Sequence, residues 1–143
     1  MLAESELMNV TRVAFAAVAA FVVYFALGGA FFANPVMRAE FMKYSPVYRS
    51  QESMKAVMPF GMLGMLLSMV ALSMLFAMIH PSGAGVWAGL QFGLIVALYA
   101  LGSFVLHNHV NLNIGPRLTT FQAIAYTVEW LAVGVVISLI YRG

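Results

Sequence analysis

The chain has 143 residues, of which 63% are hydrophobic and only 8% are charged, with a mean hydropathy of +0.93. A soluble domain carries roughly 25% charged residues, so this composition excludes a soluble globular protein and indicates an integral membrane protein of one domain. There is no cysteine, which excludes disulfides, and the formal net charge of +2 gives no support for nucleic-acid binding.

Four apolar stretches are long enough to cross a hydrocarbon core of about 30 Å, which takes about 20 helical residues. None of them contains lysine or arginine, and the alternation typical of barrel strands is absent. We therefore expect an all-α fold, an integral membrane four-helix bundle whose helices run up, down, up and down. The predicted helices cover residues 13–32, 57–79, 86–106, which could extend to 114, and 119–141.

The first apolar run is longer than the ~7–15 apolar residues of a secretory signal peptide, so we expect it to be retained as a helix. Its small residues share one face, which we predict to be its packing side; they are Ala17, Ala20 and Gly28, with Tyr24 between them. Asn34-Pro35 ends this helix, because proline cannot continue it.

The connection that follows, residues 35–55, combines aromatic and basic residues. Apolar side chains recur at spacings of four, three and four, at Met37, Phe41, Tyr44 and Tyr48, with Arg38, Lys43 and Arg49 between them. This pattern predicts a helix that lies in the membrane interface and is interrupted at Pro46. The alternative is an ordinary polar loop.

The second helix has two distinct faces. Gly61, Gly64 and Ser68 form a small-residue face suited to close helix contact. Methionines recur at spacings of four, three and four on another face, at Met58, Met62, Met65 and Met69. Thioethers can bind Cu(I), but this helix has no cysteine or histidine, so adaptable packing is the favoured interpretation and no metal site is predicted. The helix ends at the short turn His80-Pro81-Ser82-Gly83.

The third helix begins with a row of small residues and continues with a row of polar ones. Two overlapping GxxxG patterns, Gly85, Gly89, Gly93 and Ala97, predict close backbone approach to another helix. The polar row consists of Tyr99, Ser103, His107 and Asn111. At about 100° per residue we place the polar row about 40° from the glycine row. One face of the helix would then carry small residues in its first part and polar residues in its later part. An extended helix would end at Gly115-Pro116.

The fourth helix carries an acid, Glu129, near its middle. A charged side chain at the bilayer centre costs at least about 2.5 kcal/mol, so Glu129 is expected to face the interior, either neutral or paired. Thr119, Gln122 and Tyr126 share its face. We predict that this polar strip faces the third-helix row and that His107 and Glu129 lie at similar depths. Together the two rows would line a polar chamber in the cytoplasmic half of the bundle.

Three functions are compatible with such a cluster. The polar residues could simply hydrogen-bond the third and fourth helices together, or Glu129 and His107 could relay protons or hold a cation. His80, His107 or His109 could also ligate a haem or a pigment, although no haem motif is present. A hydrolytic enzyme is not expected, because the chain has no aspartate, no HEXXH and no serine beside a credible base.

The order of these features resembles a family of small four-helix bacterial membrane proteins that is classed as a domain of unknown function. The resemblance rests on the aromatic and basic first connection, the small-residue helices, the Asn-rich end of the third helix, and the fourth-helix residues Glu129, Trp130 and Gly134. Phe31-Phe32 stands where that family has an aromatic-Tyr pair. The resemblance implies the four-helix architecture and implies no activity.

The basic residues predict the orientation. The first and third connections contain five, Arg38, Lys43, Arg49, Lys55 and Arg117, whereas the termini contain Arg12 and Arg142 and the second connection has none. The two basic connections are therefore expected in the cytoplasm and both termini outside. We expect a non-enzymatic protein of a bacterial inner membrane, an accessory or oligomer-forming subunit that packs against other subunits or itself. The alternatives are a proton or small-solute carrier and a haem- or pigment-binding subunit.

Overall fold

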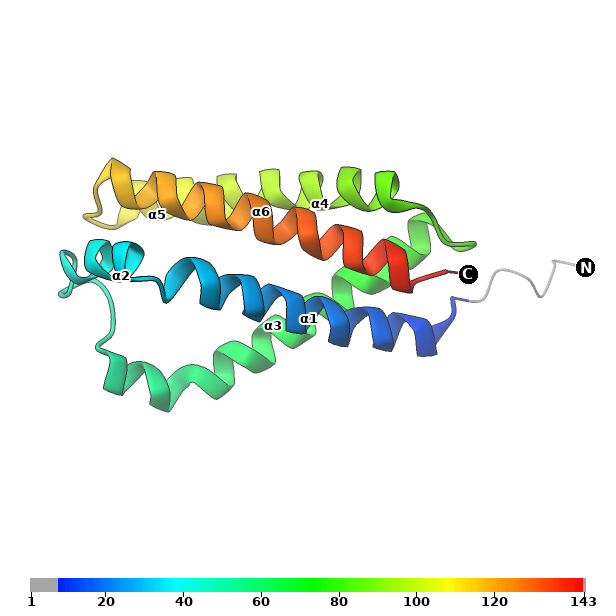
Figure 1. The fold of residues 1–143 in the computed structure, drawn as a ribbon, viewed down its shortest axis with the longest axis horizontal. Coiled ribbons are helices and arrows are strands. Elements are labelled where there is room, and N and C mark those ends of the chain that lie inside the picture. The colour runs from blue at the N-terminus through cyan, green and yellow to red at the C-terminus, as the bar shows by residue number, and fades with distance from the viewer. Residues whose placement is uncertain (1–7, 143) are drawn as a thin grey trace, which may run out of the picture.

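The computed structural model describes residues 8–142, and within this range every regular element is helical. Figure 1 shows how the helices are arranged. The elements are α1 (Val10–Phe32), α2 (Pro35–Met42), α3 (Gln51–Ile79), α4 (Val86–Ala100), a π-helical segment η1 (Leu101–Leu106), α5 (His107–Asn111) and α6 (Pro116–Ile140). The segments α4, η1 and α5 follow one another without a break and form the third long helix.

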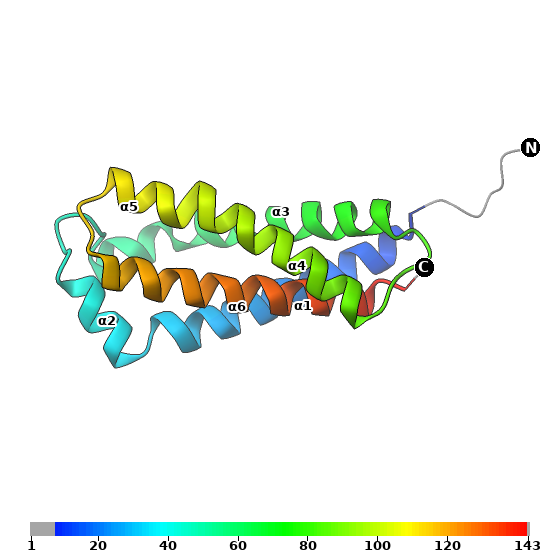
Figure 2. The same ribbon diagram turned by 90° about the horizontal axis from the view of Figure 1, so that it is seen from above.

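The predicted architecture is confirmed. Four helical stretches are long and apolar enough to cross a membrane, Val10–Phe32, Glu52–Ile79, Val86–Asn111 and Pro116–Ile140. They alternate in direction, so that the start of α1 and the end of α6 lie at one end, whereas α2, α5 and the start of α6 lie at the other (Figures 1 and 2). The chain is thus an all-α, multi-pass membrane protein. The helix predicted between the first two spans is present as α2.

Local sequence signals set the helix ends. The side chains of Asn9, Asn34 and Ser50 accept hydrogen bonds from backbone N–H groups in the first turns of α1, α2 and α3. Pro35 and Pro116 occupy the first positions of α2 and α6, where the missing N–H costs nothing.

Several predicted helix bounds differ from the structure, and the first long helix already begins at Val10 rather than at residue 13. The third long helix ends at Asn111, beyond the predicted residue 106 and short of the possible extension to 114. Pro116 begins α6 three residues before the predicted start, instead of merely ending the preceding helix. The second long helix begins at Gln51 rather than 57, because the predicted bounds counted only the apolar residues, whereas the hydrogen-bonded helix also includes its polar first turn.

The helix α6 is the centre of the packing. It packs extensively against α4 on one side and against α1 on the other, and α3 packs against α1. Figures 1 and 2 both show α6 running between α4 and α1. The small face predicted for α1 is the packing side, since Ala17 and Ala20 are fully buried. The helices therefore follow the spatial order α4, α6, α1, α3.

The helix α3 diverges from the rest of the bundle. Its C-terminal half is anchored by Met69 and Phe76, both fully buried, and Phe76 packs edge-on against Phe92 of α4. Its N-terminal half moves away from α1 (Figure 1) and contains Pro59. With 29 residues, α3 is about 43 Å long at 1.5 Å per residue, longer than a hydrocarbon core, and a helix of this length fits a bilayer by tilting, by kinking or by extending its polar first turn beyond the core.

Candidate functional site

Polar residues of α6 line its buried face. Glu129 is fully buried, and Gln122 and Thr119 are only 4% and 8% exposed. Tyr126 is half-buried between them. The structure therefore brings the four residues of this predicted strip together on the side of α6 that faces the other helices.

Glu129 occupies a site in which residues 8–142 give its carboxylate no hydrogen-bond partner. Neither of its oxygens has a hydrogen-bond partner among the described residues. Its Oε1 lies against Gly28 of α1, where an added Cβ would come within 3.3 Å. Next to it, Trp130 packs on Tyr24 of α1, with ring centroids 5.2 Å apart. An acid that is isolated in this way can take up a proton or a cation without first breaking a protein contact.

The third-helix polar row does not face this strip. Tyr99, Ser103, His107 and Asn111 are all exposed, and Tyr99 keeps 75% of its surface. Two of them bond only within their own helix, Ser103 to the Tyr99 carbonyl and Asn111 to the His107 carbonyl. The predicted polar chamber between the two rows is therefore wrong.

Helical geometry explains this error. The separation of 40° holds between Gly85 and Tyr99, but a row of residues four apart drifts by about 40° around the helix at every step. At the level of Ala97 the polar row is about 200° away, on the opposite side of the helix. The row that continues the buried face runs instead through Val105, which is fully buried, to His109.

The histidine that contacts α6 is His109. Its Nδ1 lies 2.8 Å from Thr119 Oγ1, which ties the end of the third long helix to the start of α6. His107, which we expected beside Glu129, is exposed. His80 lies at the other end of the bundle, where its ring packs on Phe76. No group of three or more His, Cys, Asp or Glu residues within 8–142 could hold a metal ion.

The predicted packing residues divide into two sets. Gly89, Gly93 and Ala97 are buried at the α4–α6 interface. A Cβ on Gly89 would lie 2.6 Å from the Gly134 carbonyl oxygen, and one on Gly93 would lie 2.9 Å from Leu131 Cα. Only glycine allows the two backbones to approach this closely.

The other predicted glycines do not pack within the chain. Gly85 is the N-cap of α4, and a Cβ added to it would meet nothing within 4 Å. Gly61 and Gly64 of α3 are exposed, and added Cβ atoms there would also meet open space. Within residues 8–142 no helix makes the close contact for which this face is suited, because α3 contacts α1 through its other half.

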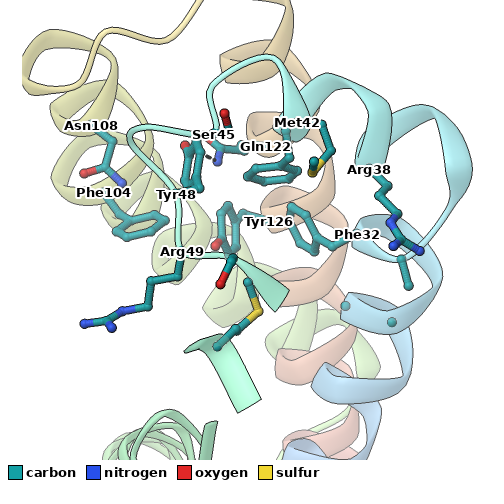
Figure 3. Close-up of a pocket in the computed structure, with 16 residues that line it drawn as sticks. Phe32, Arg38, Met42, Ser45, Tyr48, Arg49, Phe104, Asn108, Gln122 and Tyr126 are labelled. Carbon is teal, nitrogen blue, oxygen red and sulfur yellow. Dashed lines mark hydrogen bonds between the residues drawn. The ribbon is translucent and has the colours of Figure 1, made fainter. Parts of the chain in front are cut away.

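A cavity of about 710 Å³ opens at the end of the bundle that carries α2. Its wall is a continuous series of aromatic rings from five parts of the chain, each contacting the next at centroid distances from 4.8 to 6.1 Å. Figure 3 shows several of these rings grouped around the cavity, with Arg38 and Arg49 at opposite edges. In order of contact the rings are Phe104, Tyr126, Phe32, Phe41 and Tyr48.

Polar groups also reach this cavity. Gln122 and Asn108 line it, and the Gln122 Nε2 atom donates a hydrogen bond of 3.4 Å to the Tyr48 hydroxyl oxygen. The Gln122 Oε1 atom has no partner among residues 8–142. Gly28, which contacts Glu129, lines the cavity as well. The cavity is thus largely apolar, and a thin α1 wall at Gly28 separates it from the acid.

An ion pair that sequence analysis missed closes this end of the bundle. Glu40 of α2 is only 4% exposed, and its Oε2 lies 2.7 Å from Lys43 Nζ and 3.7 Å from Arg117 Nε at the start of α6. The Tyr44 hydroxyl lies close to Gly115. These contacts hold α2 against the connection before α6. The only sequence signal was an isolated acid among the basic residues of the first connection.

No family model, curated protein or solved structure matches this chain.

Proposed function

We propose that this chain is a non-enzymatic subunit of a larger assembly in a bacterial inner membrane, and that it associates through the glycine face of α3. The face consists of Gly61, Gly64 and Ser68. The observation that carries the proposal is the open space beside both glycines, whose added Cβ atoms would meet no atom within 4 Å.

The energetic argument follows from helix propensity. Glycine inside a helix costs about 1 kcal/mol relative to alanine, and at Gly89 and Gly93 that cost is offset by close contact with α6. At Gly61 and Gly64 nothing in the described chain offsets it. Apolar helices gain no hydrophobic free energy from one another in lipid, so a small-residue face contributes only where a second helix packs closely on it. The partner is another membrane subunit or a second copy of this chain.

Native mass spectrometry after gentle extraction from the host membrane tests this proposal. Wild type is expected in a complex larger than the monomer, and Gly64→Leu is expected to release it because the leucine blocks close approach. Gly102→Leu is the matched control, since Gly102 is also exposed with open space around it but lies on η1. A monomeric wild type, or a complex that survives Gly64→Leu, would refute the proposal.

The orientation belongs to the same proposal. The end that carries α2, α5 and the start of α6 also carries the five basic residues of the first and third connections. The positive-inside rule favours the cytoplasm for this end and the outside for both termini.

A second candidate function is a carrier for a proton or a small cation. The specific observation in its favour is the Glu129 carboxylate, which is fully buried with neither oxygen paired among the described residues. Reconstituted liposomes with a pH-sensitive dye test it. Wild type should dissipate an imposed proton gradient and Glu129→Gln should not, whereas equal rates for the two, or for wild type and empty liposomes, would exclude this function.

A further inference from the structure

The aromatic cavity has the shape and chemistry of a site for an amphipathic molecule. Its volume of about 710 Å³ lies within the ~300–1,000 Å³ of typical ligand pockets. The contacting rings give it an apolar interior, and Arg38 and Arg49 place a positive charge at each of two opposite edges. We propose that this cavity binds one anionic phospholipid, with the head group at the mouth of the cavity between Arg38 and Arg49 and the start of an acyl chain among the rings.

The depth of the cavity fits the two parts of such a molecule. It extends from the connection after α2 to Gly28 and Tyr126. Gly28 lies four residues inside the end of α1, which is about 6 Å at 1.5 Å per residue, and Tyr126 lies ten residues inside α6, about 15 Å. The cavity therefore begins at the level of the lipid head groups and ends within the hydrocarbon layer.

The charges around the cavity favour an anion. Neither Arg38 nor Arg49 forms an ion pair with a described residue, whereas the nearby acid Glu40 already contacts Lys43 and Arg117. Both arginines are exposed, so their long side chains can adjust to a head group. A basic residue near the membrane surface strengthens binding to anionic lipid about fivefold. Two arginines together predict a preference of about thirtyfold over a zwitterionic lipid.

The cavity is accessible to lipid from the side. The order α4, α6, α1, α3 leaves a gap between α3 and the η1–α5 segment, and the cavity lies at this gap, lined by Met54 of α3 on one side and by Phe104 and Asn108 on the other. An acyl chain can therefore enter from the bilayer without the helices unfolding. A soluble anion would contact only the arginines and leave the aromatic interior empty.

Binding to delipidated protein in detergent tests the proposal, with native mass spectrometry as the readout. We expect one phosphatidylglycerol per chain, bound about thirtyfold more tightly than phosphatidylcholine with the same acyl chains. Equal binding of the two lipids would overturn the anionic site. sn-Glycerol 3-phosphate should not compete, and competition at the concentration that phosphatidylglycerol requires would identify a soluble anion instead.

Two pairs of variants locate the site. Arg38→Gln with Arg49→Gln should reduce phosphatidylglycerol binding to the level of phosphatidylcholine, while Arg12→Gln with Arg142→Gln, at the opposite end, should leave it unchanged. Gly29 lines the cavity and a Cβ there meets nothing within 4 Å, so Gly29→Leu should project into the cavity without disturbing α1 and weaken binding of both lipids. Gly102→Leu is its control. Wild-type binding by Gly29→Leu would overturn the assignment.

Discussion

The carboxylate of Glu129 lies directly against Gly28 across the α1–α6 interface, where a Cβ on residue 28 would come 3.3 Å from Glu129 Oε1. The absence of a side chain at Gly28 therefore makes room for the acid. A residue with a Cβ at position 28 would push the carboxylate away from α1. The loss in the free energy of unfolding caused by such a residue should therefore be smaller when Glu129 is replaced.

A double-mutant cycle measures this dependence. Gly28→Ala should be more favourable in the Glu129→Ala background than in wild type by at least about 0.5 kcal/mol, because the methyl group then has no carboxylate to displace. Unfolding of the purified protein in detergent gives the four free energies. Gly29→Ala, whose Cβ meets open space, should have the same effect in both backgrounds. Additive effects of Gly28→Ala and Glu129→Ala would contradict the contact.

The isolated carboxylate also predicts the effect of an apolar replacement. Glu129→Met keeps the length of the side chain and removes a buried polar group without a partner, so the free energy of unfolding should rise by about 1–3 kcal/mol. Thermal unfolding in detergent measures it. Glu52→Met, at an exposed site in the first turn of α3, should change stability by less than about 0.5 kcal/mol. A stability loss in Glu129→Met would mean that the acid has a partner in the folded protein.

The α4–α6 interface should be intolerant of a single methyl group. In Gly93→Ala the new Cβ would lie 2.9 Å from Leu131 Cα, a backbone atom that cannot rotate away. We expect a loss of about 1–3 kcal/mol in the free energy of unfolding, as for other overpacked cores. Gly102→Ala, which adds the same methyl group in open space on η1, should be neutral or slightly stabilising. Equal effects of the two substitutions would rule out the close approach.

The ion pair at Glu40 should control the position of α2. Glu40→Gln removes the negative charge that Lys43 and Arg117 share, and we expect a modest cost of about 1 kcal/mol because both cations are largely exposed. Hydrogen exchange should become faster in α2 and remain unchanged in α4. Glu52→Gln provides a control at an acid without a described ion pair. Unchanged exchange in α2 would show that apolar contacts alone hold this helix.

The proposed orientation can be tested with single cysteines, because the chain contains none. A membrane-impermeant maleimide should label Ser45→Cys and Asn113→Cys only from the cytoplasmic side, and Ser82→Cys only from the outside. All three positions are exposed and lie in connections between helices. Labelling of Ser45→Cys and Ser82→Cys from the same side would contradict the alternating helices, and a fully reversed pattern would contradict the proposed sidedness.

The long helices could be predicted from the sequence because each contains an apolar run that only a spanning helix can accommodate. The inward direction of Glu129 followed from the cost of a charge in lipid, and the packing side of α1 from the small residues Ala17 and Ala20. In each case one strong local constraint determined the result. No such constraint fixed which side of the third long helix faces the bundle. A polar residue in its exposed row need not point inward when it can bond within its own helix, as Ser103 does to the Tyr99 carbonyl oxygen.

Which helices contact one another could not be predicted from the sequence, for a related reason. Gly61 and Gly89 both belong to small-residue faces, yet only Gly89 meets another helix of this chain. Lipid-facing and helix-facing surfaces are both apolar, so composition does not distinguish them. The cavity was also unpredicted, because its rings come from distant elements and assemble only when α6 lies between α1 and η1. The spacing of Phe41 and Tyr48 predicted a helical face rather than two neighbouring walls of one pocket.

The central place of α6 has a consequence for biosynthesis. Because α6 joins α4 to α1, a chain that is still being made has a paired α1 and α3, with α4 held to them mainly by the short turn after α3 and the Phe76–Phe92 contact, until α6 is inserted. The insertion of α6 also brings Glu129 into the membrane, next to Gly28 of α1, whose lack of a side chain leaves room for the carboxylate. Ribosomes that stop before α6 would leave α4 in the bilayer without its main packing partner, and such a chain is expected to be a substrate for membrane proteases.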